Sequence, residues 1–142
     1  DLISAFHRRL TSDDEATRLA AARAWSVWEG ATSFLHYDPA FTAAHEEPEF
    51  ALAFARIENH YFVHSGFFDA DDQLLRDADR IAHIPTFIVH GRYDVVCPVQ
   101  NAYDLKRALP QAELVITPAS GHSAFEAENV DALVRATDRF AG

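Results

Sequence analysis

Two residues that could act together as an acid and a base each follow a short apolar segment. Asp94 comes just after "TFIVHG" (residues 86–91), and His122 comes just after "AELVITP" (residues 112–118). In open parallel sheets, catalytic groups gather beyond the carboxyl ends of the strands. A carboxylate that accepts a hydrogen bond from an imidazole fixes its tautomer and stabilises its protonated form. The spacing therefore predicts an Asp–His pair in which His122 takes up and returns a proton.

Both residues also have a structural interpretation. Asp94 precedes a predicted helix by only a few residues, where an aspartate often serves as an N-terminal cap. A single histidine beside a glycine, as in "SGHS", is often structural or simply exposed. The functional interpretation depends on the occurrence of both residues after successive strands.

Two glutamates occupy positions that disfavour a negative charge. Glu29 falls in the last turn of a predicted helix, close to Trp25 and Trp28, where the helix dipole is unfavourable. Glu58 shares a helix face with Phe54 and is predicted to be buried. Two carboxylates in an apolar pocket need a cation to offset their desolvation and mutual repulsion. They are therefore candidates for binding a cationic ligand.

Two alternatives remain open for these glutamates. They could form structural ion pairs, with Arg23 or Arg56 as partners. A metal is the other candidate ligand, since His60 and His64 lie four residues apart, but "HYFVH" differs from the zinc motif H-E-x-x-H.

The first 65 residues are predicted to be helical. "SDDE" (residues 12–15) has the form of a capping box, and the helix that it starts should end near Gly30. A loop, "HYDPAFTAAHEEP", should follow. A second helix is expected from Glu49 to about Val63, with one face formed by Phe50, Phe54, Ile57 and Tyr61.

The remainder alternates strand, helix, strand and helix, which is typical of a parallel α/β layer. The helices are expected in "PVQNAYDLKRALP" and "SAFEAENVDALVRATDRFAG", the latter with Val130, Leu133, Val134 and Thr137 on one face. Two strands do not form a stable open sheet alone. The sheet is therefore expected to continue in a segment outside this chain.

Composition narrows the classes of partner. The chain has 142 residues and a formal net charge of −10, which argues against a nucleic-acid partner. No apolar run is long enough to cross a membrane. The single cysteine, Cys97, fits a reducing compartment and a cytoplasmic location.

The order of the candidate residues indicates an α/β-hydrolase, in which nucleophile, acid and histidine follow one another along the chain. The acid and the histidine are present, but no G-x-S-x-G motif surrounds any serine. The nucleophile is therefore expected upstream of Asp1.

Four segments, "AARAWSVWEGATSFL", "FARIENHYFVHSGFF", "IPTFIVHGRYDVVCP" and "ASGHSAFE", together resemble the prolyl aminopeptidases (proline iminopeptidases). These are serine peptidases of the α/β-hydrolase fold. The resemblance implies the C-terminal part of that fold, in which the end of a parallel sheet with flanking helices (residues 76–142) is preceded by a helical cap (residues 1–75).

The resemblance also implies roles for individual residues. Asp94 and His122 match the acid and base of the catalytic triad, and Glu29 and Glu58 match the carboxylates that bind the amino group of an N-terminal proline. Cys97 matches a cysteine near the proline pocket. The implied partners are a peptide with N-terminal proline and the upstream half of the protein, with no cofactor, metal, nucleic acid or membrane. The alternatives are an esterase, an epoxide hydrolase, or an inactive fragment that associates with its missing half.

Overall fold

The computed structural model describes residues 1–141, which divide into two compact units. The first, here called the helical unit, comprises Asp1–Thr32 and Tyr37–Asp69. The second, the α/β unit, comprises Ser33–His36 and the described residues from Ala70 onward. The short segment Ser33–His36 thus belongs to the α/β unit, although it directly follows a helix of the other unit.

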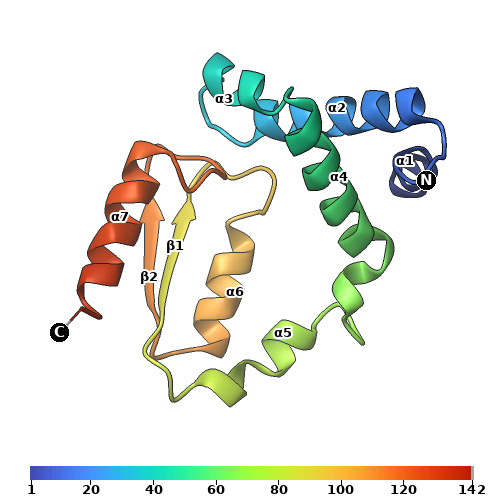
Figure 1. The fold of residues 1–142 in the computed structure, drawn as a ribbon. Helices are drawn as coiled ribbons and strands as arrows, with labels where there is room; N and C mark the ends of the chain where they lie inside the picture. Colours follow the sequence, from blue (N-terminus) through green and yellow to red (C-terminus); the bar gives the residue numbers. More distant parts are fainter. Residues whose placement is uncertain (142) are drawn as a thin grey trace. The chain divides into compact units, whose positions relative to one another are not determined.

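The helical unit packs its helices around small side chains. Its elements are α1 (Leu2–Leu10), α2 (Glu15–Thr32), α3 (Pro39–Ala44), α4 (Pro48–Val63) and the 3₁₀ helix η1 (Ser65–Phe67) (Figure 1). The core brings Ala21 and Ala22 of α2 together with Ala51 and Ala55 of α4, and it also includes Leu10 and Trp25. Alanines at the contact allow the two helix backbones to approach closely, and larger apolar side chains fill the flanks.

The start of α2 differs from the prediction. Asp14, rather than Ser12, caps the helix, because its Oδ2 accepts hydrogen bonds from the Thr17 backbone N–H (2.9 Å) and hydroxyl (2.5 Å). The bond from the Thr17 hydroxyl, followed by the one from its backbone, holds the pKa of Asp14 below the ordinary value of 3.8. The capping box predicted from Ser12 and Glu15 is therefore wrong.

A further helix, α3, occupies the segment that was predicted to be a loop. Its cap is Asp38, whose Oδ1 accepts from the Phe41 backbone N–H at 2.9 Å. Pro39 stands in the first turn, where its missing N–H costs nothing. An aspartate followed by proline is a helix start signal, and here it begins α3 rather than a loop.

The face that α4 buries is also not the predicted one. Its buried residues are Ala51, Ala55 and Asn59, whereas Ile57 and Tyr61 are more than half exposed, at 61% and 52%. The large side chains do recur at helical spacing, but close packing against α2 selects the neighbouring stripe of small residues. The predicted bounds of the helix, Glu49 to Val63, agree with the observed Pro48–Val63 to within one residue.

The α/β unit contains two parallel strands, as predicted. In chain order its elements are α5 (Gln73–Arg76), the 3₁₀ helix η2 (Ala78–Ile81), β1 (Phe87–Gly91), α6 (Gln100–Ala108), β2 (Glu113–Thr117) and α7 (Ala127–Asp138). The register pairs Phe87 with Glu113 and Gly91 with Thr117, so both strands end at the same edge. Figure 1 shows α6 and α7 on opposite sides of the strands. Because the two strands end at the same edge, the loops after β1 and β2 lie next to each other.

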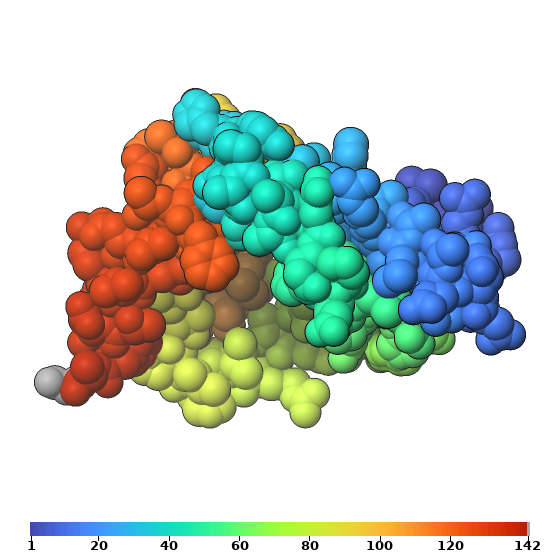
Figure 2. Space-filling model, turned by 45° about the horizontal axis from the view of Figure 1, so that its top comes forward, coloured from blue at the N-terminus to red at the C-terminus, as the bar shows by residue number. Residues whose placement is uncertain are grey.

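Helix α7 leaves several large apolar side chains exposed. Val130, Leu133 and Val134 are all exposed, whereas Asn129, Ala132 and Ala136 are buried. Figure 2 shows α7, in red, at the surface. The predicted apolar face of this helix exists, but its side chains remain exposed in the described structure.

Within residues 1–141, no helix combines the length and the apolar character that a membrane span requires.

Candidate functional site

Asp94 lies in the turn that leaves β1, and the backbone of that turn holds one of its oxygens. Oδ1 accepts hydrogen bonds from the backbone N–H groups of Val96 (3.0 Å) and Cys97 (2.8 Å). The side chain is only 5% exposed. Helix α6 begins later, and its cap position, Val99, makes no side-chain hydrogen bond. Asp94 therefore caps its own turn rather than the helix, and Oδ2 remains available for another partner.

The structure brings His122 to that second oxygen. His122 Nδ1 lies 3.0 Å from Asp94 Oδ2, and the imidazole is 36% exposed. Since a carboxylate accepts, Nδ1 carries the hydrogen, and Nε2 of the neutral ring is left with a lone pair. An imidazole in this tautomer can accept a proton from a hydroxyl group at Nε2.

A second imidazole, which the sequence analysis missed, lies beside the same carboxylate. His90, on β1, has its Nε2 2.9 Å from the Cys97 carbonyl oxygen and 3.4 Å from Asp94 Oδ2. The carbonyl can only accept, so Nε2 of His90 donates and ties the strand to the turn that holds Asp94. A polar residue within the apolar run "TFIVHG" was the signal that could have identified it.

Among the described residues, the two serines nearest to His122 in the sequence are not exposed as a nucleophile would have to be. Ser120 and Ser123 flank His122 closely in sequence, but they are buried, at 1% and 6% exposed. Ser123 Oγ accepts a hydrogen bond from the backbone N–H of Phe125 at 3.2 Å. The hollow beside Asp94 and His122 has a volume of about 80 Å³, enough for water but not for a peptide.

Cys97 is connected to the Asp94 turn through its main chain. Its N–H donates to Asp94 and its carbonyl accepts from His90, while the residue itself is exposed. Its backbone thus helps to fix the acid, independently of the thiol.

The two glutamates lie on neighbouring helices of the helical unit. Glu58, on α4, accepts a hydrogen bond at Oε2 from Nε1 of Trp25, on α2, at 2.6 Å. Trp25 is 7% exposed and has Phe6 and Phe62 as ring neighbours at 5.1 and 5.9 Å. The predicted ion-pair partner Arg23 instead pairs with Glu46 at 3.0 Å. An indole, rather than an arginine, therefore orients the Glu58 carboxylate.

Glu29 lines an apolar hollow of about 390 Å³. Its walls include Trp25 and Trp28 of α2, Phe6 of α1 and Phe62 of α4. A carboxylate in an aromatic wall suits a small cation with an apolar body. Both glutamates thus lie near Trp25: Glu29 lines the same hollow, and Glu58 accepts its hydrogen bond.

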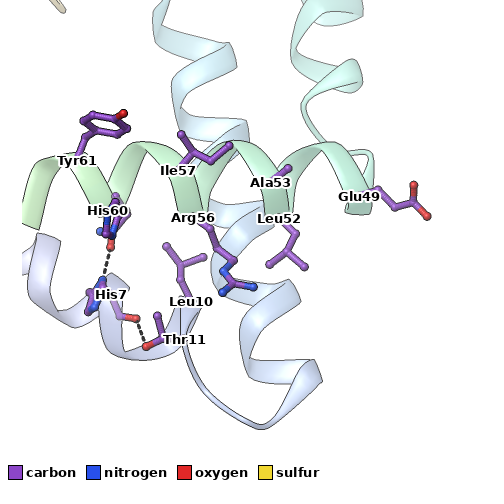
Figure 3. A pocket seen from close by; sticks show the side chains of 11 residues that line it. His7, Leu10, Thr11, Glu49, Leu52, Ala53, Arg56, Ile57, His60 and Tyr61 are labelled. Atoms are coloured by element: carbon purple, nitrogen blue, oxygen red, sulfur yellow. Dashed lines mark hydrogen bonds between the residues drawn. The ribbon is translucent and has the colours of Figure 1, made fainter.

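A larger hollow of about 810 Å³ lies between α1 and α4. Figure 3 shows His7, Arg56 and His60 around it, with Thr11 Oγ1 donating to the His7 carbonyl at 2.8 Å. Its lining includes neither Glu29 nor Glu58. Size alone therefore does not identify the candidate site.

The candidate metal ligands do not form a complete set. His60, on α4, and His64, the residue that caps the C-terminus of this helix, have ring centroids 4.6 Å apart. Among residues 1–141, no three histidine, cysteine or carboxylate side chains are grouped so that they could hold a metal ion.

Comparisons of the sequence with known proteins identify the family of this chain. A family model described as the alpha/beta hydrolase fold matches residues 2–128. A protein named proline iminopeptidase from Xanthomonas citri is 77% identical over 141 residues, which cover 99% of this chain and 45% of the relative. Proteins of the same name from Arabidopsis thaliana and Neisseria gonorrhoeae are 53% and 43% identical, over 88% and 96% of this chain and 33% and 43% of their own lengths.

The chain thus spans less than half the length of these relatives. The match nevertheless includes Asp94, His122, Glu29 and Glu58, which all lie within residues 2–128. The parallel strands, the loops at their carboxyl ends and the matched family model lead to the same conclusion: the chain belongs to the alpha/beta hydrolase fold family, as a segment homologous to proline iminopeptidases.

Proposed function

We propose that this chain supplies the acid, the base and the amino-group-binding carboxylates of a serine aminopeptidase that releases N-terminal proline from peptides. The observation that carries the proposal is the hydrogen bond between His122 Nδ1 and the buried carboxylate of Asp94, at 3.0 Å. The homology to proline iminopeptidases supports the choice of substrate.

In this mechanism the nucleophile is a serine upstream of Asp1, as the family resemblance implies. Its Oγ attacks the prolyl carbonyl carbon while its proton passes to Nε2 of His122. Asp94 stabilises the resulting imidazolium. His122 then gives the proton to the leaving amine as the C–N bond breaks, and the same sequence with water releases proline and restores the serine.

The glutamates account for the restriction to free amino termini. An N-terminal proline is a secondary ammonium ion on a compact apolar ring. In the proposal, Glu29 and Glu58 hold the ammonium and aromatic side chains such as Trp28 contact the ring. Anchoring the terminus places the first peptide bond at the nucleophile, which yields an aminopeptidase rather than an endopeptidase.

The proposal assigns residues 1–75 to a substrate-binding cap and residues 76–142 to the end of the catalytic domain. Its partner is the upstream half of the same protein, which would contribute the serine and the rest of the sheet. Cys97, whose main chain contacts Asp94, is assigned to the edge of the proline pocket. The single cysteine supports a cytoplasmic location.

Hydrolysis of proline naphthylamide, alanine naphthylamide and a simple ester tests the function. Each would be measured with this chain alone and with the chain joined to the upstream half of its Xanthomonas citri relative. We expect activity only in the joined protein, with a strong preference for proline. A joined protein that cleaves the ester but not the proline amide would support the esterase alternative and overturn the substrate assignment.

A further inference from the structure

The backbone N–H groups around His122 all donate hydrogen bonds to acceptors within the α/β unit. The backbone N–H groups of His122 and Ser123 both donate to the carbonyl oxygen of Ser33, at 3.1 and 2.8 Å. The N–H of Gly121 donates to Glu126 Oε1 at 2.7 Å. Three successive amide donors thus have fixed acceptors, and two of them meet a segment nearly 90 residues earlier in the chain.

Glu126 connects these segments through its second oxygen. Glu126 Oε2 accepts from the backbone N–H of Leu35 at 3.1 Å. One carboxylate therefore bridges the peptide before His122 and the segment Ser33–His36. Glu126 occupies the cap position of α7 yet makes no side-chain capping bond to that helix. Its hydrogen-bonding capacity is used for the bridge instead, at a helix start where negative charge is favourable.

Asn129 completes the attachment from inside α7. It is 4% exposed, and its Nδ2 donates to the carbonyl oxygens of Ser123 (2.8 Å) and Gly121 (3.4 Å). Its Oδ1 accepts from the hydroxyl of Thr117, the last residue of β2, at 2.6 Å. The loop is therefore connected to both the strand that it leaves and the helix that it enters.

The loop also has no room to shift towards β1. A Cβ atom on Gly91, the last residue of β1, would lie 1.9 Å from the Gly121 carbonyl oxygen. With this contact on one side and the Glu126 bridge on the other, rotation of the side chain is the main freedom left to His122. The hydrogen bond to Asp94 then selects its rotamer.

We propose that Glu126 is a positioning residue for His122, and that its bridge between Gly121 and Leu35 sets the distance of the imidazole from Asp94. This inference rests on the proposed function for its link to turnover. Hydrogen bonds that involve a charged acceptor are about twice as strong as neutral ones, so a carboxylate is well suited to this bridge. Neither Glu126 nor Leu35 touches the Asp94 carboxylate through a described hydrogen bond, and the effect on the pair is indirect.

The test compares Glu126→Gln with Glu128→Gln in the complete enzyme. Glu128 is a matched control because its Oε2 accepts from the backbone N–H of Ala119 at 2.7 Å, two residues before Gly121. Both changes remove one negative charge from the start of α7. In Glu126→Gln, however, two backbone N–H groups face a side chain that has only one oxygen to accept them. One of the two hydrogen bonds of the bridge is therefore lost.

We expect kcat on proline naphthylamide to fall about ten- to a hundredfold in Glu126→Gln, with KM within about twofold, because a small misplacement of a catalytic group acts on turnover. Glu128→Gln should retain nearly full kcat. Equal kcat in the two variants would overturn the proposal. If Glu126→Gln does not fold, Glu126→Asp is measured instead, because its shorter side chain keeps the charge but does not reach both amides. Full kcat in Glu126→Asp would also overturn the proposal.

The NMR signal of the His122 Nδ1–H proton tests the positioning role of Glu126 without relying on turnover, and therefore independently of the proposed function. In the complete protein labelled with ¹⁵N-histidine, we expect this signal to broaden or move upfield in Glu126→Gln and to be unchanged in Glu128→Gln. That result would support positioning even if the protein did not cleave proline amides. An identical signal in both variants would contradict it.

Discussion

The two candidate regions hold their carboxylates in different ways. Asp94 in the α/β unit is fixed by two backbone amides and one imidazole within 3.0 Å and is almost fully buried. Glu58 in the helical unit accepts its described hydrogen bond from one side chain, the indole of Trp25, and is only partly buried. A carboxylate that orients a base must not move, whereas one that binds a cation must keep an oxygen open to the ligand. The comparison fits the proposed division, in which Asp94 orients a base and Glu58 binds a cation.

The largest effect should come from the Asp94–His122 pair. In the complete enzyme, His122→Ala and Asp94→Asn should each lower kcat by about 10⁴-fold, because the base is lost or its tautomer is no longer fixed. Steady-state hydrolysis of proline naphthylamide measures this. Asp104→Asn, an aspartate on α6 that contacts Gln100 and Arg107, is the control and should be nearly neutral. Near-normal turnover in Asp94→Asn would end the triad assignment.

The tight packing around the pair should show in stability. Gly91→Ala places a methyl group against the Gly121 carbonyl, and we expect a loss of about 1–3 kcal/mol in the free energy of unfolding. Urea denaturation of the complete protein measures it. Gly121→Ala should cost less, because its Cβ would lie 2.9 Å from its nearest neighbour, the backbone nitrogen of Leu35. The reverse order of the two losses would contradict the close approach of the two loops.

The binding region should respond in KM rather than kcat. Glu58→Gln removes a charge that would face the substrate ammonium, and we expect KM for proline naphthylamide to rise about tenfold, in line with hydrogen bonds to charged groups. The change in kcat should be small. Glu49→Gln, at an exposed position on the same helix, provides the control. Unchanged kinetics in Glu58→Gln would assign this glutamate a structural role.

The smallest effect should come from the group that orients Glu58. Trp25→Phe keeps an aromatic ring beside Phe6 and Phe62 but removes the N–H that donates to Glu58. We expect about a threefold rise in KM, since one neutral donor to a carboxylate is lost while the charge remains. In a Glu58→Gln background the same change should have less effect. Additive effects of the two substitutions would show that the hydrogen bond is unimportant for binding.

Local patterns predicted the two strands and the two longer helices of the α/β unit, but not the short helix α5 or the 3₁₀ helix η2. The apolar runs ending at Gly91 and near Thr117 became parallel strands, and the proline-bracketed segment between them became α6. Patterns were less successful in the helical unit, where they missed α3, mistook the cap of α2 and chose the wrong face of α4. A strand must pair with a neighbouring strand to satisfy its backbone hydrogen bonds, whereas a helix satisfies its own, so the face that a helix buries is decided by packing.

The adjacency of Asp94 and His122 could be predicted from the order of strands and loops along the chain, because parallel strands that end at one edge must bring their loops together. The contacts that hold the two residues could not be predicted in this way. His90 beside Asp94, Trp25 on Glu58 and the bridge from Glu126 to Leu35 each depend on side chains from separate elements. Such contacts follow no repeat along the chain, since their geometry is set by how the elements pack.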